Sequence, residues 1–349
     1  MAKPKEKEGR AAARAESRKE LYKILDKAVG AGQGRTIPEQ EFEPVKFVPT
    51  GLIGVDWLLG GGVPLGRVVE IYGLESCGKT TLALMMIAQI QRETGKDVAY
   101  IDAEHTFDEE WARKLGVDID KMYFLQPNSG EQAMEACEAF AASGLVGAIV
   151  LDSVAYMTPM AEMAGDHGDR NVGALPRLMA QGMRKITPIL AKNDCTWILL
   201  NQVRDKIGGQ QQNKFADNTT TPGGHAVRHA ASIRIKLYRS QYKQGEERVG
   251  DYVHLRAVKN KVAPPFRQAV VPLVYGTGLD RVAELFDLAL EYKLIDQRGA
   301  FYKLGDESLQ GKQAATEFLR SRPDLQEALR PQVQAVLTVR SGLGLEESE

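Results

Sequence analysis

Through the middle of the chain, short uninterrupted apolar runs alternate with longer segments in which apolar residues recur every three or four positions. Uninterrupted runs are typical of strands covered on both faces, and the longer segments are typical of helices that bury one face. This alternation predicts an α/β core with a mostly parallel twisted sheet, flanked by helices and connected by right-handed crossovers. The predicted strands are residues 68–72, 98–102, 148–152 and 196–201, and the predicted helices are residues 80–93, 131–142 and 174–192.

Beyond this core, three more apolar runs follow one another without helices between them, which predicts an antiparallel extension of the sheet. These runs are residues 232–238, 252–259 and 269–275. From about residue 280 the pattern becomes mostly helical, beginning with residues 281–292, and it predicts a small C-terminal α/β domain.

Before the core, residues 1–20 are mostly charged residues and alanine, and we expect a mobile tail there. Residues 21–29 have the spacing of a short amphipathic helix, and a linker with glycines and prolines follows. The predicted organisation is an N-terminal tail and helix at 1–40, a core at 41–280, a small C-terminal domain at 281–340 and an acidic tail at 341–349.

Composition narrows the class of protein. The 349 residues carry a net charge of −1, which argues against a binder of nucleic acid that relies on overall positive charge alone. The three cysteines, Cys77, Cys137 and Cys195, are odd in number and lack C-x-x-C spacing, so we expect neither a disulfide framework nor a cysteine zinc site. The N-terminus lacks a secretory signal and no apolar run is long enough to span a membrane, so we expect a cytoplasmic protein.

Residues 73–80, GLESCGKT, match the phosphate-loop pattern G-x-x-x-x-G-K-[ST] between a predicted strand and a predicted helix. In such a loop, glycines let backbone N–H groups converge on phosphate oxygens, the lysine reaches the β- and γ-phosphates, and the threonine hydroxyl ligates Mg²⁺. The following helix points its positive end at the same anion. The alternative is a glycine turn with an incidental lysine. The residues expected to bind ATP are Gly73, Glu75, Ser76, Cys77, Gly78, Lys79, Thr80 and Thr81, with Thr80 also a Mg²⁺ ligand.

Acidic and amide side chains follow three of the predicted strands. Asp152 ends the run AIVLD, the form of a Walker B strand whose carboxylate holds Mg²⁺; a strand-capping aspartate is the alternative. Glu104 lies beyond the end of strand 98–102, at the edge where ligands bind in open α/β sheets. It is either a water-activating carboxylate or a solvated loop residue. Gln202, which follows Asn201 at a further strand end, is either a hydrogen-bond partner of the γ-phosphate or a loop amide.

Taken together, these motifs closely resemble those of the RecA-type recombinases of bacteria and their viruses, over residues 50–337. The segments that carry the resemblance, in the family's order, are GLESCGKTTLAL, YIDAEHTFD, VLDSVAYMTPMAE, NQVRDKIG, TTTPGGHA, VKNKVAPPF and VYGTG. The resemblance implies a RecA-like ATPase core and a DNA-dependent ATPase that uses ATP and Mg²⁺. It also implies helical filaments on single-stranded DNA, strand exchange with a homologous duplex, and a role in DNA repair and the SOS response to DNA damage.

The resemblance also assigns roles to individual residues. Glu104 becomes the water-activating carboxylate and Gln202 the γ-phosphate sensor. Lys259 and Lys261 of VKNK would reach the ATP of a neighbouring subunit and stabilise the charge that spreads over the transferred phosphoryl group. Without the resemblance they would be ordinary edge-strand lysines. The remaining nucleotide contacts fall at Asp108, Trp111, which would stack on adenine, and Tyr275.

Two glycine-rich polar segments, residues 162–173 and 206–224, match the family's mobile DNA-binding loops. Arg177 and Arg184 lie seven positions apart on the helix between them, where they would contact successive phosphates unless they are only a solvated charged face. Binding should be mainly to the DNA backbone and tolerant of sequence. The other candidates are Gly223 and Gly224 as phosphate-binding amides, Arg204 and Arg228 as cationic contacts, and Val172 and Ile207 as apolar wedges between bases.

Some features depart from the family and keep alternatives open. His229 and Ala230 stand where the family usually has aromatic residues, and the second loop is longer than usual, which indicates a divergent member. A hexameric helicase or branch-migration motor is one alternative, although the four-cysteine module and protease-like domain of the bacterial branch-migration proteins are missing. A nucleotide-switched DNA-binding scaffold is another, although Lys79, Glu104 and Asp152 are intact. A self-cleaving repressor is a further partner that some relatives have.

Overall fold

The computed structural model describes residues 4–32, 44–164, 173–205, 219–244 and 247–343. The chain divides into two units, Met1–Pro44 and Val45–Glu349. The first contains one helix, α1 (Pro4–Val29), so the expectation of a tail up to residue 20 was wrong for residues 4–20. The physical reason is composition: Ala, Glu, Lys and Arg favour the helix even where no apolar stripe is present.

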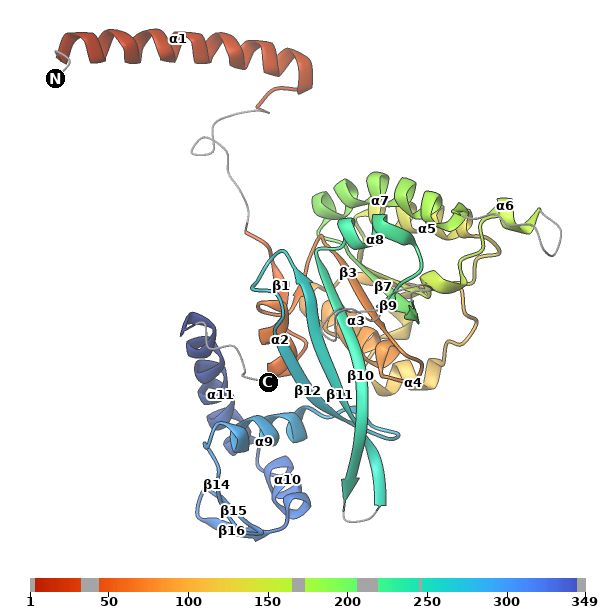
Figure 1. The fold of residues 1–349 in the computed structure, drawn as a ribbon, viewed down its shortest axis with the longest axis vertical. Coiled ribbons are helices and arrows are strands. Elements are labelled where there is room, and N and C mark those ends of the chain that lie inside the picture. Colours follow the sequence, from red (N-terminus) through yellow and green to blue (C-terminus); the bar gives the residue numbers. More distant parts are fainter. Residues whose placement is uncertain (1–3, 33–43, 165–172, 206–218, 245–246, 344–349) are drawn as a thin grey trace. The chain divides into compact units, whose positions relative to one another are not determined.

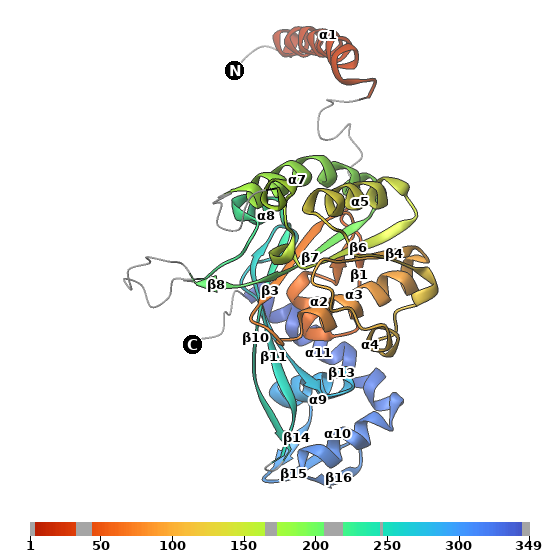
Figure 2. The same cartoon turned by 90° about the vertical axis from the view of Figure 1, so that its right-hand side faces the viewer.

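A nine-stranded sheet forms the core of the second unit's described residues (Figures 1 and 2). Its order is β13-β12-β11-β10-β3-β7-β6-β4-β5, in which the pairs from β10 to β5 are parallel and those from β10 to β13 are antiparallel. The predicted parallel sheet and its antiparallel extension are therefore confirmed. The strands are β3 (Val68–Gly73), β4 (Asp97–Asp102), β5 (Met122–Leu125), β6 (Val146–Asp152), β7 (Thr196–Gln202), β10 (Ile233–Gln244), β11 (Glu247–Asn260), β12 (Gln268–Val274) and β13 (Gly278–Leu279).

Helices cover both faces of this sheet, which is why β3 and β6 are buried along their whole length. On one face, α2 and α3 pack on Ile71, Val150 and Leu200. On the other face, α5 and α7 pack on Ile149 and Leu199, and α8 lies against α7. These helices are α2 (Ile53–Leu59), α3 (Lys79–Thr94), α5 (Gly130–Ser143), α7 (Ala174–Asn193) and α8 (Gly224–Ala230).

Short elements connect or flank the main ones. They are β1 (Phe47–Val48), β2 (Val63–Pro64), α4 (Glu109–Lys114), the 3₁₀ helices Ile119–Lys121 and Val154–Tyr156, α6 (Met160–Met163), β8 (Arg204–Asp205) and β9 (Thr219–Thr220). Strands β8 and β9 pair antiparallel, which brings the residues just before the second predicted DNA-binding loop next to Thr219–Thr220 within it. Residues 165–172 of the first predicted loop and 206–218 of the second lie outside the described residues.

After the sheet, the chain forms a smaller helical and antiparallel region with its own apolar cluster, to which Phe286, Leu319 and Val333 belong. Ile53 of α2 is buried in the same cluster, and Trp57 packs against it, so this region shares apolar contacts with the core. Its elements are α9 (Arg281–Glu291), β14 (Asp296–Arg298), β15 (Phe301–Leu304), β16 (Glu307–Gln310), α10 (Lys312–Arg320) and α11 (Pro323–Leu343).

A buried carboxylate joins this C-terminal region to the core. Glu284 of α9 is 1% exposed, and its two oxygens accept hydrogen bonds from the backbone N–H groups of Ile53 (2.8 Å) and Gly54 (3.0 Å). These are the first amides of α2, which have no partner within the helix, so Glu284 caps a helix from a distant part of the chain. Burial raises the pKa of Glu284 to about 8.

This pKa predicts how stability depends on pH. A carboxyl group that titrates near pH 8 when folded and near 4.5 when unfolded holds its proton more tightly in the folded state. Its contribution to stability is therefore fully present below about pH 4.5 and is lost as the pH rises to 8. Glu284→Gln removes this titration but leaves Asp56, whose pKa burial raises to about 6.

We therefore expect the melting temperature of the native chain, relative to Glu284→Gln, to fall as the pH rises from 5 to 8. Thermal unfolding of both proteins in parallel at three pH values measures this difference. A difference that stays constant, or that grows with pH, would show that Glu284 is ionised throughout.

Candidate nucleotide-binding and DNA-binding sites

The predicted phosphate loop lies between β3 and α3, as the sequence indicates. Two of its glycines are required sterically. A Cβ at Gly73 would lie 2.4 Å from the carbonyl oxygen of Leu237 on the neighbouring strand β10. Gly78 precedes α3 with φ of +88°, in the left-handed region that favours glycine. Together they let the loop fold closely against the sheet and turn into α3, whose first backbone amides have no partner within the helix and could bind phosphate.

Side chains of the loop divide into exposed and buried ones. Glu75 and Ser76 are exposed, whereas Cys77 is 1% exposed, and burial raises the pKa of its thiol. Cys77 is therefore a packing residue and not a reactive thiol. Lys79 folds back over the loop, where its Nζ donates to the carbonyl oxygens of Leu74 (2.7 Å) and Gly73 (3.3 Å).

Beside the loop, Asp152 ends strand β6 and is almost fully buried. Its Oδ2 accepts hydrogen bonds from the hydroxyl groups of Thr80 (3.2 Å) and Tyr100 (2.6 Å). Burial raises the pKa of Asp152, whereas these two hydrogen bonds lower it. Thr80 and Asp152 thus bring a hydroxyl and a carboxylate together, which fits the protein part of a Mg²⁺ site that also uses phosphate and water oxygens. Tyr100 was missed by the sequence reasoning, because only the strand order shows that it reaches Asp152.

Of the two acids at the end of β4, Asp102 is its last residue and is buried, whereas Glu104 follows the strand and is partly exposed. Its Oε2 accepts from the hydroxyl group of Ser153 (3.1 Å), the residue directly after Asp152. Asp102 is fully buried and accepts from the backbone N–H groups of Thr106 and Phe107. Asp102 therefore fixes the loop that carries Glu104, and Glu104 has the exposure that a water-activating carboxylate needs. Ser153 was not foreseen, although its place after the Walker B aspartate was a usable signal.

Gln202 ends strand β7 and is paired with Gly73, the first residue of the phosphate loop. Its side chain is partly exposed, whereas the preceding Asn201 is fully buried. The two amides therefore differ in exposure: the side chain of Gln202 is partly accessible, whereas that of Asn201 binds the protein groups Glu70 and Pro222.

The three residues predicted to contact the nucleotide beyond the loop come from two segments. Asp108 accepts from the backbone N–H of Trp111 (3.0 Å) and so caps α4. Trp111 is partly buried, and a Cβ at Gly278 would lie 3.9 Å from its ring. Tyr275, which precedes Gly278 by three residues, is half exposed, and its hydroxyl donates to Asp251 (3.2 Å). Trp111 and the 275–278 turn are thus close together.

Lys259 lies near the C-terminal end of β11, and Lys261 directly follows that strand. Both lysines contact α8. The Nζ of Lys259 donates to the carbonyl oxygens of Arg228 (2.5 Å) and His229 (3.0 Å), and that of Lys261 donates to His229 (3.1 Å). Burial and the neighbouring Lys261 lower the pKa of Lys259 to about 8. Within one chain, both ammonium groups therefore cap the C-terminal end of α8. Their predicted contact with a neighbour's ATP stays a prediction.

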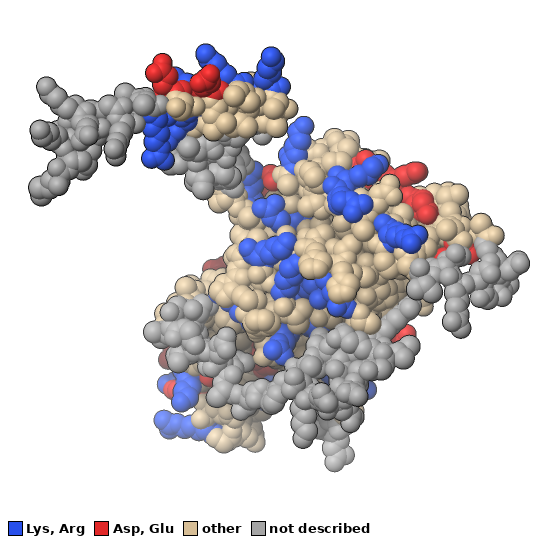
Figure 3. All heavy atoms as spheres, turned by 45° about the horizontal axis from the view of Figure 1, so that its top comes forward, with Lys and Arg blue, Asp and Glu red and all other residues tan. Residues whose placement is uncertain are grey.

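Among the predicted DNA contacts, Arg177 and Arg184 are both exposed on α7. Figure 3 shows Lys and Arg side chains gathered on the face of the core that carries α7 and α8. Gly223 and Gly224 begin α8 with φ of +86° and +72°. Arg228 donates to the hydroxyl of Thr220, so part of its guanidinium holds the base of the second loop. Arg204 belongs to β8, and Val172 and Ile207 lie outside the described residues.

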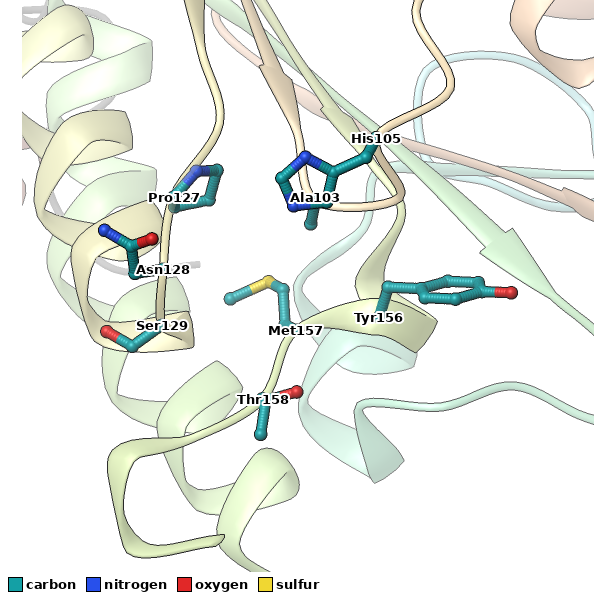
Figure 4. A pocket seen from close by; sticks show the side chains of 8 residues that line it. All are labelled: Ala103, His105, Pro127, Asn128, Ser129, Tyr156, Met157 and Thr158. Carbon is teal, nitrogen blue, oxygen red and sulfur yellow. The ribbon is translucent and has the colours of Figure 1, made fainter. Parts of the chain in front are cut away.

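A small cavity of about 160 Å³ lies at the same sheet edge, beyond the ends of β4, β5 and β6. Figure 4 shows that three connecting segments supply its walls, and no residue that the sequence singled out for nucleotide binding lines it. The lining residues are Ala103, His105, Pro127, Asn128, Ser129, Tyr156, Met157 and Thr158.

The strand–loop–helix with its lysine, the Thr80–Asp152 pair and the accessible Glu104 define a phosphate-loop ATPase. Comparison with known families specifies this class further. The chain matches the RecA N-terminal domain over residues 18–280 and the RecA C-terminal domain over residues 283–338. The chain therefore belongs to the RecA family.

Individual relatives agree with this assignment. The chain is 44% identical over 330 residues to Protein RecA of Sulfurovum sp. (strain NBC37-1), covering 94% of both chains. It is 42% identical over 325 residues to Protein RecA of Staphylococcus carnosus (strain TM300), covering 92% of this chain and 90% of that one. Protein RecA of Staphylococcus aureus (strain JH9) is 42% identical over 332 residues, with 94% of both chains covered.

Membership of this family establishes a DNA-dependent ATPase of recombination and DNA repair, with a place in the SOS response. The protein binds ATP, binds single- and double-stranded DNA, and associates with itself. Within the described residues, none of the helices has both the length and the apolar character needed to cross a membrane.

Proposed function

We propose that the chain assembles with ATP and Mg²⁺ into helical filaments on single-stranded DNA, pairs that strand with a homologous duplex and exchanges strands. The observation that carries the ATP-dependent part is the contact of Thr80 with Asp152 beside the phosphate loop, with Glu104 bound to Ser153, the residue after Asp152. Thr80 and Asp152 would hold Mg²⁺, which supplies charge neutralisation at the phosphates.

In this proposal, Lys79 and the amides at the start of α3 orient the triphosphate, and Glu104 orients the attacking water and accepts its proton. The water oxygen forms a bond to the γ-phosphorus while the bond to the β–γ bridging oxygen breaks, which leaves ADP and phosphate. Gln202, at the end of β7, would bind the γ-phosphate and detect its loss. Asp108, Trp111 and Tyr275 would hold the base and sugar.

Single-stranded DNA would lie along the face that carries α7 and the start of α8. Arg177 and Arg184 are exposed there, and the backbone amides of Gly223 and Gly224 at the start of α8 are proposed phosphate contacts, of which Gly224 is only partly buried and Gly223 is buried. Arg204, Arg228, Val172 and Ile207 remain proposed contacts of the two loops. Because these groups suit phosphates and not base edges, binding is expected to depend on salt and to tolerate any sequence.

The experiment that tests this function combines three measurements on the purified chain. ATP hydrolysis is measured with and without single-stranded DNA, filaments are imaged by electron microscopy with a slowly hydrolysed ATP analogue, and strand exchange is followed between a circular single strand and a linear duplex. DNA-stimulated hydrolysis with no joint molecules would leave the ATPase and remove the strand-exchange part. Filaments without hydrolysis would instead support a nucleotide-switched scaffold.

The proposed role of Lys259 and Lys261 at a neighbour's ATP predicts rescue in mixed filaments. Neither Lys259→Ala nor Glu104→Gln should hydrolyse ATP efficiently alone, because each site lacks one required group. In a mixture, some interfaces combine a native Lys259 with a native Glu104, so DNA-dependent hydrolysis should partly return.

The matched control is a mixture of Lys259→Ala with Lys261→Ala. Every interface in that mixture still lacks one ammonium group, so no rescue is expected. Hydrolysis rates as a function of the mixing ratio give the result, and a flat response for Lys259→Ala with Glu104→Gln would place both lysines outside the neighbour's site.

The proposal keeps the predicted division of the chain. Its parts are a segment at 1–40 that mediates self-association, a core at 41–280, a small domain at 281–340 and a tail at 341–349. A cytoplasmic location is proposed because ATP and chromosomal DNA are the substrates there. A self-cleaving repressor is proposed as an additional partner. Incubating such a repressor with filaments, and looking for its cleavage products, tests that partner directly.

A further inference from the structure

One buried charge in the core has no role in the proposed chemistry. Glu70 lies in the middle of β3, the central strand of the nine-stranded sheet, between β10 and β7, and is 0% exposed. A carboxylate in such a position is costly unless charged and polar partners compensate for its lost hydration. An apolar side chain at this central position would avoid the cost of burying a charge. The residues that Glu70 binds therefore indicate its role.

Glu70 binds one partner on each neighbouring strand. Its Oε1 accepts from the side-chain amide of Asn201 on β7 (3.0 Å). Its Oε2 accepts from Nε of Arg234, which lies directly opposite on β10. The guanidinium of Arg234 also lies over the ring of Tyr72, 4.7 Å from its centre. Glu70 thus fixes two side chains that reach beyond the sheet in the same direction.

Both partners also contact the segment that follows β9 within the second predicted DNA-binding loop. Asn201 donates to the carbonyl oxygen of Pro222 (3.0 Å), and Arg234 donates to the hydroxyl of Thr221 (3.4 Å). Thr221 is 4% exposed, so this contact is shielded from water. The two residues directly follow β9, which closes the base of the loop against β8.

The same partners also contact the ATP site. The Oδ1 of Asn201 accepts from the backbone N–H of Gln202 (3.0 Å), the residue proposed to sense the γ-phosphate. Arg234 is paired across the β10–β11 ladder with Lys259, the lysine proposed to reach a neighbour's ATP. Asn201 therefore connects Gln202 with the segment after β9 by hydrogen bonds, and Arg234 contacts that segment from the position paired with Lys259. Glu70 is the common partner of both side chains.

We propose that Glu70, together with Asn201 and Arg234, is a positioning group that couples the ATP site to the second DNA-binding loop. Asn201 uses its amide N–H groups on Glu70 and Pro222 and its oxygen on the backbone N–H of Gln202, so a displacement of the Gln202 backbone on the γ-phosphate would change the contacts of Asn201 with Glu70 and Pro222. This inference rests on the proposed roles of Gln202 and of the second loop.

The quantity that reports coupling is a ratio: the affinity for single-stranded DNA with a slowly hydrolysed ATP analogue, divided by the affinity with ADP. A merely structural role of Glu70 would weaken both affinities alike and leave the ratio unchanged. We expect Glu70→Gln to lower the ratio about tenfold, because the charge on which Arg234 depends is lost, and the affinity for a fluorescent ATP analogue without DNA to change less than about twofold.

Two threonine variants complete the test. Thr221→Val removes only the hydroxyl that Arg234 contacts and should lower the ratio about threefold. Thr196→Val is the matched control, since Thr196 is equally buried, lies on the same strand as Asn201 and donates to Pro64 (2.9 Å) at the opposite end of the sheet. It should leave the ratio within about twofold of the native value.

The inference is overturned if Thr221→Val and a folded Glu70→Gln both keep the native ratio. If Glu70→Gln does not fold, Thr221→Val alone decides.

Gln202→Ala, measured in parallel, separates this inference from the function on which it rests. If the DNA affinity of the native protein does not depend on the bound nucleotide, both the sensor proposal and this inference are contradicted. The same holds if Gln202→Ala keeps the native ratio of DNA affinities. Native coupling in the Glu70 and Thr221 variants, but lost coupling in Gln202→Ala, would contradict this inference only.

Discussion

Lys79→Ala is expected to abolish ATP binding at physiological concentrations and, with it, every nucleotide-dependent filament on DNA. Lys79 is the loop's only ammonium group, and its Nζ already lies over the carbonyl oxygens of Gly73 and Leu74, where phosphates would be bound. A hydrogen bond from a charged group contributes about 1.5–3 kcal/mol, which corresponds to a loss of affinity of roughly tenfold to a hundredfold for each contact.

Titration with a fluorescent ATP analogue measures the loss, and electron microscopy with single-stranded DNA shows its effect on assembly. Lys303→Ala is a suitable control, because Lys303 is exposed on β15 in the C-terminal region. Normal filaments from Lys79→Ala at the ATP concentrations that suffice for the native chain would exclude the loop from its proposed role.

The second large effect is expected from Glu104→Gln, which should bind ATP with native affinity and hydrolyse it at least about a hundredfold more slowly. Glutamine keeps the size of the side chain and can still accept the hydrogen bond from Ser153. It cannot take a proton from water, so the loss falls on the chemical step and not on binding.

Single-turnover hydrolysis on DNA, together with ATP affinity, distinguishes these two steps. Glu138→Gln is the matched control, since Glu138 is a surface residue that pairs with Lys185 at 3.4 Å, a contact of little energetic weight. Unchanged turnover in Glu104→Gln would show that another group activates the water. A weakened ATP affinity would show that Glu104 acts in binding instead.

Local patterns predicted the strands and helices of the core because these elements are buried on both faces or along one stripe. The four predicted parallel strands and three helices are all present, and GLESCGKT is indeed the turn between a strand and a helix. The edge strand β5 was not predicted: Tyr123 and Phe124 are half exposed there, so its pattern is not that of a buried run. The N-terminal helix was predicted only over residues 21–29, because residues 4–20 have no apolar stripe to detect.

The site was predictable where one sequence motif contains it and unpredictable where strand order creates it. Lys79 and Thr80 follow from a motif of eight residues. Tyr100 and Glu70 look like ordinary strand positions in DVAYID and VVEIYG, and only the placement of β4 beside β6, and of β3 between β10 and β7, brings them to Asp152 and Arg234. The sequence placed Glu104 beyond the end of its strand, but only the structure shows that Asp102 is buried and Glu104 partly exposed.

The cap that α9 provides for α2 has a consequence for how the protein can be divided. A fragment ending near residue 280 would keep every residue proposed to touch ATP or DNA, yet it would leave the first amides of α2 bare and Ile53 without its apolar neighbours. Helix α2 in turn supports the turn after β11 through the side chain of Asn260, which donates to the carbonyl oxygen of Leu58 (3.2 Å). Removing the C-terminal region would therefore destabilise α2 and, through Asn260, the turn that contains Lys261.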